Sequence, residues 1–138
     1  MKIAILYFFS NADSSSKNGA IVKKLTQKLQ EASHSVEPVC AFNRDSNFRL
    51  TPYDYVAVVM PCQGIFNGKA HKDTAKVLGE LGSLGGKKSA ALIIKSGFMP
   101  WKACTSLMRI MESEGMLIDY SDVVLSVDHA AYVSKKLG

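Results

Sequence analysis

Residues 3–9 read IAILYFF, a near-continuous apolar run, and residues 10–19 read SNADSSSKNG, a loop rich in serine and asparagine. From Lys17 onward, apolar side chains recur at helical spacing, at Ile21, Val22, Leu25 and Leu29. An apolar run without polar alternation is typical of a strand covered on both faces, and a period near 3.6 predicts an amphipathic helix. This stretch therefore predicts the first strand and the first helix of a βαβ unit.

The rest of the chain repeats this alternation. Pro38 indicates that the second strand lies at a sheet edge, Gly115 is expected to end a helix, and the last strand is expected to break near Asp119–Asp122. The predicted strands are 3–9, 35–42, 55–60, 88–95 and 116–127, and the predicted helices are 17–32, 69–81, 101–114 and a short one in the last ten residues. Such alternation requires a parallel sheet with right-handed crossovers, so we expect one doubly wound α/β domain over residues 1–138.

Composition agrees with a packed domain, since 47% of the 138 residues are hydrophobic and 21% are charged. The three cysteines, Cys40, Cys62 and Cys104, have no metal-binding spacing, which favours a reducing compartment, and we expect the cytoplasm. No apolar run reaches the ~18 residues of a membrane span, and the opening run lacks a signal-peptide cleavage site. We therefore expect no membrane partner.

The net charge of +5 is unevenly distributed along the chain. Residues 1–28 hold five lysines and one acid, residues 69–102 hold seven lysines and two acids, and residues 112–128 hold five acids and no base. A basic balance is compatible with nucleic acid, anionic ligands or acidic partners. The lysine-rich helices lack interleaved aromatic residues and match no nucleic-acid module, so we expect no nucleic-acid partner.

Ligands of open α/β sheets bind beyond the carboxyl ends of the strands, so the loop after each strand is a candidate site. The first loop leads into a helix, whose free backbone N–H groups attract phosphate, and its neutral side-chain donors suit a phosphate monoester without a metal. Its candidate residues are Ser10, Asn11, Ser14, Ser15, Ser16 and Asn18. Two features leave the alternative of an ordinary capped loop open: a serine can cap the helix, and Asp13 would repel a phosphate.

The loops after the third and fourth strands carry glycines and aromatic rings that could enclose a planar ligand. The candidates are Pro61, Gln63, Gly64, Phe66 and Asn67 in the first of these loops, and Ser96, Gly97, Phe98 and Trp101 in the second. In the alternative interpretation, Phe66 is simply buried and Trp101 closes the top of the core.

These three loops and the order of the elements resemble the flavodoxin family over essentially the whole chain. The resemblance implies a three-layer sandwich with a five-stranded parallel sheet in the order 2-1-3-4-5 and one bound FMN, whose phosphate contacts the first loop and whose isoalloxazine ring lies between the other two. The chain departs from the family at three points: Lys17 stands where a glycine would fall, Gln63 and Phe66 replace the usual tryptophan, and the acidic surface is absent.

Other sites are less well supported. A receiver domain would need acidic residues after the first strand and an aspartate where Pro61 and Cys62 stand, and a cysteine phosphatase would need an arginine in the loop around Cys62. Cys62 is therefore interpreted as structural. The histidines (His34, His71 and His129) have no metal-ligand spacing, and three aspartates (Asp119, Asp122 and Asp128) are expected to form a solvated surface.

We therefore expect an FMN-binding, flavodoxin-like electron-transfer protein with no catalytic side chain and no metal. Two alternatives stay open: an NAD(P)H-dependent FMN reductase, and a binding or accessory module of the same fold that has lost FMN. Whether the chain is an enzyme, and its oligomeric state, are left undecided. The expected partner is a redox protein with an acidic surface, because lysines gather around the three loops, at Lys17, Lys69, Lys72, Lys95 and Lys102.

Overall fold

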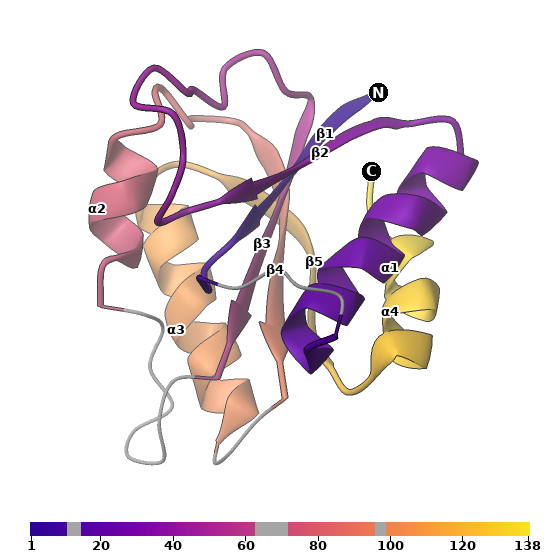
Figure 1. Ribbon diagram of the computed structural model, residues 1–138. Helices are drawn as coiled ribbons and strands as arrows, with labels where there is room; N and C mark the ends of the chain where they lie inside the picture. Colours follow the sequence, from indigo (N-terminus) through magenta and orange to yellow (C-terminus); the bar gives the residue numbers. More distant parts are fainter. Residues whose placement is uncertain (11–14, 63–71, 96–98) are drawn as a thin grey trace.

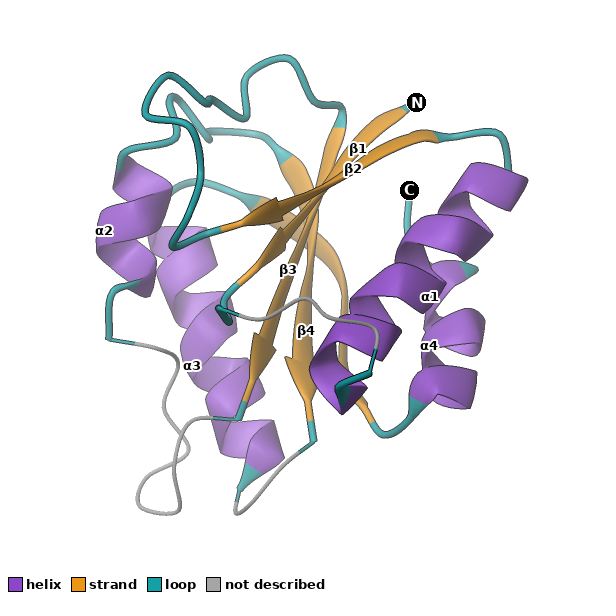
Figure 2. Cartoon of the chain, in the orientation of Figure 1, coloured by secondary structure: helices purple, strands orange, loops and turns teal. Residues whose placement is uncertain are grey.

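The computed structural model describes residues 1–10, 15–62, 72–95 and 99–138 (Figures 1 and 2). Strands and helices follow one another along the chain in the order β1 (Lys2–Tyr7), α1 (Lys17–Glu31), β2 (Ser35–Cys40), β3 (Tyr55–Pro61), α2 (Thr74–Gly79), β4 (Lys88–Ile94), α3 (Pro100–Ser113), β5 (Leu117–Val124) and α4 (Val127–Ser134). In this part of the chain no helix is both long enough and apolar enough to cross a membrane.

The five strands form one parallel sheet in the order β2-β1-β3-β4-β5. This confirms the expected doubly wound α/β fold and its strand order. Strand β2 lies at one edge, as Pro38 predicts, because an edge strand has an unpaired side that tolerates a residue without an N–H group.

Helices cover both faces of the sheet because both faces are apolar. Successive side chains of a strand point to opposite sides, so Ile3 and Ile5 pack with α1 and α4, whereas Ala4 and Leu6 pack with α2 and α3. Figure 2 shows the two helix pairs on opposite sides of the sheet. The central strands β1, β3 and β4 are therefore buried from both sides, as their unbroken apolar runs predict.

The connection between β2 and β3 contains no helix, although every residue in it is described. Residues 41–54 form turns instead, and Leu50 and Tyr53 are buried in the same core as α2 and α3. The Leu50 N–H donates to the Leu81 carbonyl over 2.9 Å, and the Tyr53 hydroxyl donates to the Glu37 carboxylate. An irregular segment thus covers the part of the sheet where a crossover helix would otherwise lie.

Two predicted elements differ from the observed ones. Helix α2 begins at Thr74 rather than near 69, and residues 69–71 lie outside the described part. The predicted break in the last strand is wrong, because β5 is continuous and contains a bulge: Ser89 pairs with Ile118 and Ala90 with Tyr120. The bulged residue is Asp119, whose carboxylate accepts a hydrogen bond of 2.5 Å from the buried Tyr55 hydroxyl.

Gly115 ends α3 as predicted, and its conformation explains why glycine is needed there. Its φ is +86°, and a Cβ at this position would lie 3.0 Å from the Gly85 Cα. The Gly115 carbonyl also accepts a hydrogen bond of 2.8 Å from the Gly86 N–H. The close approach of two backbone segments fixes the turn that leads into β5.

The Gly115→Ala change is expected to lower the free energy of unfolding by roughly 1–3 kcal/mol, because it combines a left-handed conformation with a backbone clash. The matched control is Gly79→Ala at the end of α2, where a Cβ meets no atom within 4 Å and alanine favours the helix. Denaturant unfolding of both variants measures the difference. Equal stabilities of the two variants would contradict this account of the turn.

Candidate functional site

The carboxyl ends of the strands form a rigid edge on which the predicted site loops begin. Backbone hydrogen bonds continue past the ends of the strands: the Phe8 N–H donates to the Val59 carbonyl (2.8 Å), Cys62 to Ile94 (3.1 Å) and Lys95 to Val124 (2.9 Å). In Figure 1, β3 and β4 point towards the start of α3. The sheet therefore fixes the chain at Phe8, Cys62 and Lys95, at or shortly before the start of each loop.

At the start of α1, the Ser16 hydroxyl caps the helix. Its Oγ accepts a hydrogen bond of 3.1 Å from the Gly19 N–H. The backbone N–H groups of Lys17 and Asn18 have no acceptor within the helix, because they belong to its first turn. That turn contains no acidic residue, so its partial positive charge is not offset by a carboxylate of the helix. This end of α1 suits an anion.

The other predicted residues of the first loop are only partly described. Ser10 and Ser15 are exposed and Asn18 is half-buried at this edge. Asn11 and Ser14, with Asp13, lie outside the described residues. Capping by Ser16 does not compete with donation to a phosphate, because the cap uses an acceptor lone pair of the hydroxyl and not its hydrogen.

A contact that the sequence did not reveal links the first and third loops. The Lys17 Nζ donates a hydrogen bond of 3.0 Å to the Lys95 carbonyl, which follows β4. The two residues are 78 positions apart, and no local pattern indicates such a pairing. The bond holds a positive charge at the edge between α1 and β4.

At the third loop, Trp101 is 63% exposed in the first turn of α3. The alternative interpretation, in which Trp101 closes the core, is therefore wrong. Met99, immediately before the helix, is 44% exposed and adopts the left-handed conformation with φ 58°. Pro61 is half-buried at the end of β3, opposite Ile94. The remaining predicted residues of these loops, Gln63, Gly64, Phe66, Asn67, Ser96, Gly97 and Phe98, lie outside the described residues.

The cysteines near this edge are poor nucleophiles. Cys62 is only 6% exposed, and burial raises the pKa of its thiol above the ordinary value. Burial, together with the charge of Asp122, raises the pKa of Cys104 to about 11. Both thiols remain protonated at neutral pH, which fits the structural interpretation of Cys62. Among the described residues, no group of three or more potential ligands is placed to hold a metal ion.

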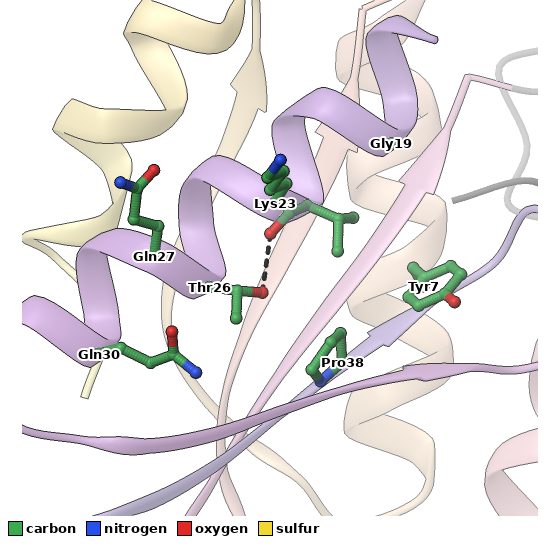
Figure 3. Close-up of a pocket in the computed structure, with 8 residues that line it drawn as sticks. Tyr7, Gly19, Lys23, Thr26, Gln27, Gln30 and Pro38 are labelled. Atoms are coloured by element: carbon green, nitrogen blue, oxygen red, sulfur yellow. Dashed lines mark hydrogen bonds between the residues drawn. The ribbon is translucent and has the colours of Figure 1, made fainter. Parts of the chain in front are cut away.

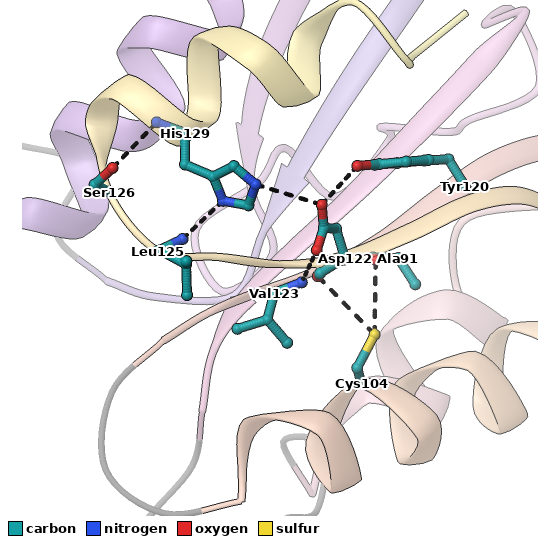
Figure 4. A network of polar contacts seen from close by, with 8 residues as sticks. All are labelled: Ala91, Cys104, Tyr120, Asp122, Val123, Leu125, Ser126 and His129. Carbon is teal, nitrogen blue, oxygen red and sulfur yellow. Dashed lines mark hydrogen bonds and ion pairs between the residues drawn. The ribbon is translucent and has the colours of Figure 1, made fainter.

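A polar network at the end of β5 corrects the expectation for Asp122, which is only partly exposed (Figure 4). The Asp122 carboxylate accepts a hydrogen bond of 2.6 Å from the Tyr120 hydroxyl and lies 3.5 Å from the His129 Nε2. The Nδ1 of the same imidazole accepts a hydrogen bond of 3.0 Å from the Leu125 N–H. Asp119 and Asp128 are exposed as expected, although Asp119 also accepts the hydrogen bond from Tyr55, whereas Asp122 is engaged in structural contacts.

Both nitrogens of the His129 ring are therefore used to hold α4 against β5, and its Nε2 carries the hydrogen that points to Asp122. The sequence offered no signal for this network, because the aspartate and the histidine are separated by a turn and match no motif. Because both ring nitrogens of His129 are engaged by Leu125 and Asp122, we interpret the Asp122–His129 pair as structural.

The described part of the chain also has an open groove of about 700 Å³ between α1 and β2 (Figure 3). Tyr7 and Pro38 line one side, and polar side chains of α1, among them Lys23 and Gln27, line the other. None of the predicted site residues lines this groove. The groove runs beside the edge strand and reaches the start of α1 at Gly19.

Comparison with known proteins supports the fold through structure and not through sequence. No protein-family model and no curated protein matches the chain. Flavodoxin 2 from Bacillus cereus has a TM-score of 0.75 at 17% identity, covering 99% of this chain and 97% of its own. A flavodoxin from Streptococcus pneumonia TIGR4 has a TM-score of 0.73 at 16% identity, covering 99% and 97%. A Fusobacterium nucleatum flavodoxin bound to flavin mononucleotide has a TM-score of 0.64 at 13% identity, covering 99% of both chains. The chain therefore has the flavodoxin fold.

The Tyr120→Phe change tests the polar network. It removes a hydrogen bond to a carboxylate, so we expect the free energy of unfolding at pH 7 to fall by about 1 kcal/mol. The control is Tyr132→Phe, because the Tyr132 side chain is 53% exposed. Denaturant unfolding measures both variants.

The loss of stability at alkaline pH gives a second measurement of the effect of Tyr120→Phe. Burial, followed by the hydrogen bond to Asp122, raises the pKa of the Tyr120 hydroxyl in the folded state above its ordinary value of 10.0. The stability that this proton supports is present below pH ~10 and is lost as the pH rises further. The Tyr120→Phe variant should accordingly lose less stability between pH 9 and 11 than the parent, and parallel curves would contradict the assignment.

Proposed function

We propose that this protein binds FMN non-covalently at the carboxyl edge of its sheet and transfers electrons through it. The observation that carries the proposal is the juxtaposition of two features at one edge of a flavodoxin fold. The start of α1 offers N–H groups to an anion, and the start of α3 exposes Trp101, a large aromatic ring. One protein of the same fold is bound to flavin mononucleotide.

The phosphate end of FMN fits the start of α1. The first turn of the helix lacks a carboxylate and supplies the Lys17 and Asn18 N–H groups. The hydroxyls of Ser15 and Ser16 stand immediately before this turn, and neutral donors of this kind bind a phosphate without a metal. The proposal gives Ser10, Asn11 and Ser14 the same role.

The ring end of FMN fits the start of α3. Trp101 presents its indole to solvent at the edge where β3 and β4 end, and stacking on an aromatic ring stabilises a planar ligand. When bound, FMN supplies the electron-transfer chemistry, and the side chains of this protein bind and orient it. The proposal extends to Pro61 and to the predicted residues of the 63–67 and 96–98 segments as neighbours of the ring.

The two alternatives, an NAD(P)H-dependent FMN reductase and a module that has lost FMN, can be distinguished from an electron carrier by their flavin spectra. A reductase would accept electrons from NAD(P)H directly, so the flavin colour of the loaded protein would bleach when NAD(P)H alone is added. A carrier would bleach only when a partner reductase is also present, and a module without flavin would not quench FMN fluorescence. We place the protein in the cytoplasm, which the three free cysteines support.

The Ser16→Ala change tests the phosphate role. We expect a fluorescence titration to show FMN binding weakened by roughly 1.5–3 kcal/mol, with riboflavin binding much less affected, because a donor to a charged group is removed. The same change also removes a helix cap, which costs the folded protein about 1 kcal/mol.

Ser126→Ala separates the two effects. Ser126 caps α4 with a hydrogen bond of the same length, 3.1 Å, from the His129 N–H. This variant should lose comparable stability and retain the affinity for FMN. Equal loss of FMN and riboflavin binding in Ser16→Ala would refute the phosphate role, and failure of the parent to bind FMN at all would refute the proposed function.

A further inference from the structure

The start of α3 is built in a way that lowers its own stability. Met99 is the residue before the helix, adopts the left-handed conformation and forms no side-chain cap. A left-handed conformation costs a non-glycine residue about 1 kcal/mol or more. Met99 and Trp101 also expose 44% and 63% of their surface. Several unfavourable features at one place, here a left-handed residue, a helix start without a side-chain cap and two exposed apolar side chains, are typical of a functional surface.

Lysines at two helix starts also lower the stability of those helices. Lys17 is the first residue of α1 and Lys102 lies in the first turn of α3, and neither first turn contains an acid. A cation at a helix N-terminus opposes the helix dipole, where an acid would contribute ~0.3–1 kcal/mol. Helix α4 follows the stabilising pattern, with Ser126 as its cap and Asp128 in its first turn. Only the two helices that start beside the candidate site, among these three, carry the unfavourable charge.

These residues belong to one surface. The Lys17 Nζ lies 3.0 Å from the Lys95 carbonyl, so the start of α1 and the end of β4 are adjacent. Lys95 and Met99 are four positions apart, which limits their separation to roughly 14 Å. We call this surface, formed by Lys17, Lys95, Met99, Trp101 and Lys102, the lysine–tryptophan face; all three of its lysines are exposed.

Nearby aspartates of the described residues are directed elsewhere. Asp128 lines a groove of about 570 Å³ between α1 and α4 together with Lys28 and Glu31. Asp122 accepts the hydrogen bond of Tyr120 and lies against His129. The face itself contains no acidic residue, and its three lysines are exposed.

We propose that the lysine–tryptophan face docks an acidic protein surface, which belongs to the electron-transfer partner. The face has the composition of an interaction centre: a large aromatic ring and a methionine that can be buried, bordered by cations. Lysines attract an oppositely charged partner over a distance and increase the rate of encounter. The identity of the partner as a redox protein rests on the proposed function, whereas the docking surface is defined by described residues alone.

Trp101 is the only tryptophan in the sequence, so its fluorescence reports directly on the face. The test adds poly-L-glutamate, which contains no tryptophan, to the protein and follows the emission of Trp101 at low and high salt. Binding should change the emission and weaken as salt rises. The double variant Lys95→Glu, Lys102→Glu should bind the polymer about tenfold more weakly.

The matched control is Lys88→Glu, Lys135→Glu, two exposed residues at the amino end of β4 and the end of α4. Each double change lowers the net charge from +5 to +1, because every Lys→Glu change removes two charges. The control should retain the parent affinity within about threefold, since exposed charges beyond the Debye length of ~8 Å at physiological salt are largely screened.

Three results would overturn the proposal: no change of Trp101 emission at saturating polymer, equal weakening in both double variants, or tighter binding of a single-stranded oligo(dT), which would make the face a nucleic-acid surface. A separate FMN titration distinguishes this failure from that of the proposed function. A protein that binds FMN without docking poly-L-glutamate refutes the docking surface alone. A protein that docks the polymer without binding FMN refutes the electron-transfer role and leaves the docking surface standing.

Discussion

Burial of β1 from both sides is the constraint on which the rest of the structure depends. Ile3 and Ile5 need apolar cover on one side, and Ala4 and Leu6 need it on the other. A parallel neighbour can be reached only by a crossover, and crossovers on both faces of the sheet supply that cover. Because all five strands are parallel, the loops that follow them gather at one edge, and the reversal of strand order beside β1 separates the loops there and opens a crevice. The position of the candidate site is thus a consequence of how the core is covered.

Much of the fold was predictable because its signals are local. Unbroken apolar runs indicate strands buried on both faces, helical spacing indicates α1 and α3, and a glycine at 115 indicates a stop. The segment 41–54 gave no such signal, since turns have no period, yet it buries Leu50 and Tyr53. The bulge at Asp119 was predicted as a break, because its pairing partners in β4 and its hydrogen bond from Tyr55, 64 positions away, are long-range contacts without a local signal.

The position of the candidate site in the fold was predictable from the sequence, whereas the contacts and backbone conformations within it were less predictable. Fold topology indicates which loops meet, and Ser15, Ser16, Pro61 and Trp101 do lie at that edge. The Lys17–Lys95 bond and the conformation of Met99 were not predictable, because one is a long-range contact and the other is a left-handed conformation at a residue type that rarely adopts it. Such features arise from the assembled edge and not from any neighbouring sequence.

Three of the helices that start at the carboxyl side, α1, α3 and α4, show how the chain distributes stability. Helix α4 has a cap and an acid in its first turn, α1 has a cap and a lysine, and α3 has neither a cap nor an acid. Packing of Leu107 and Met111 in the core can hold α3 in place without a cap, because hydrophobic burial outweighs a capping bond of ~1 kcal/mol. The start of α3 is therefore free to carry exposed tryptophan and lysine side chains. The net charge of +5 takes its meaning from this placement, since screening makes the charges within ~8 Å of a partner matter more than the total.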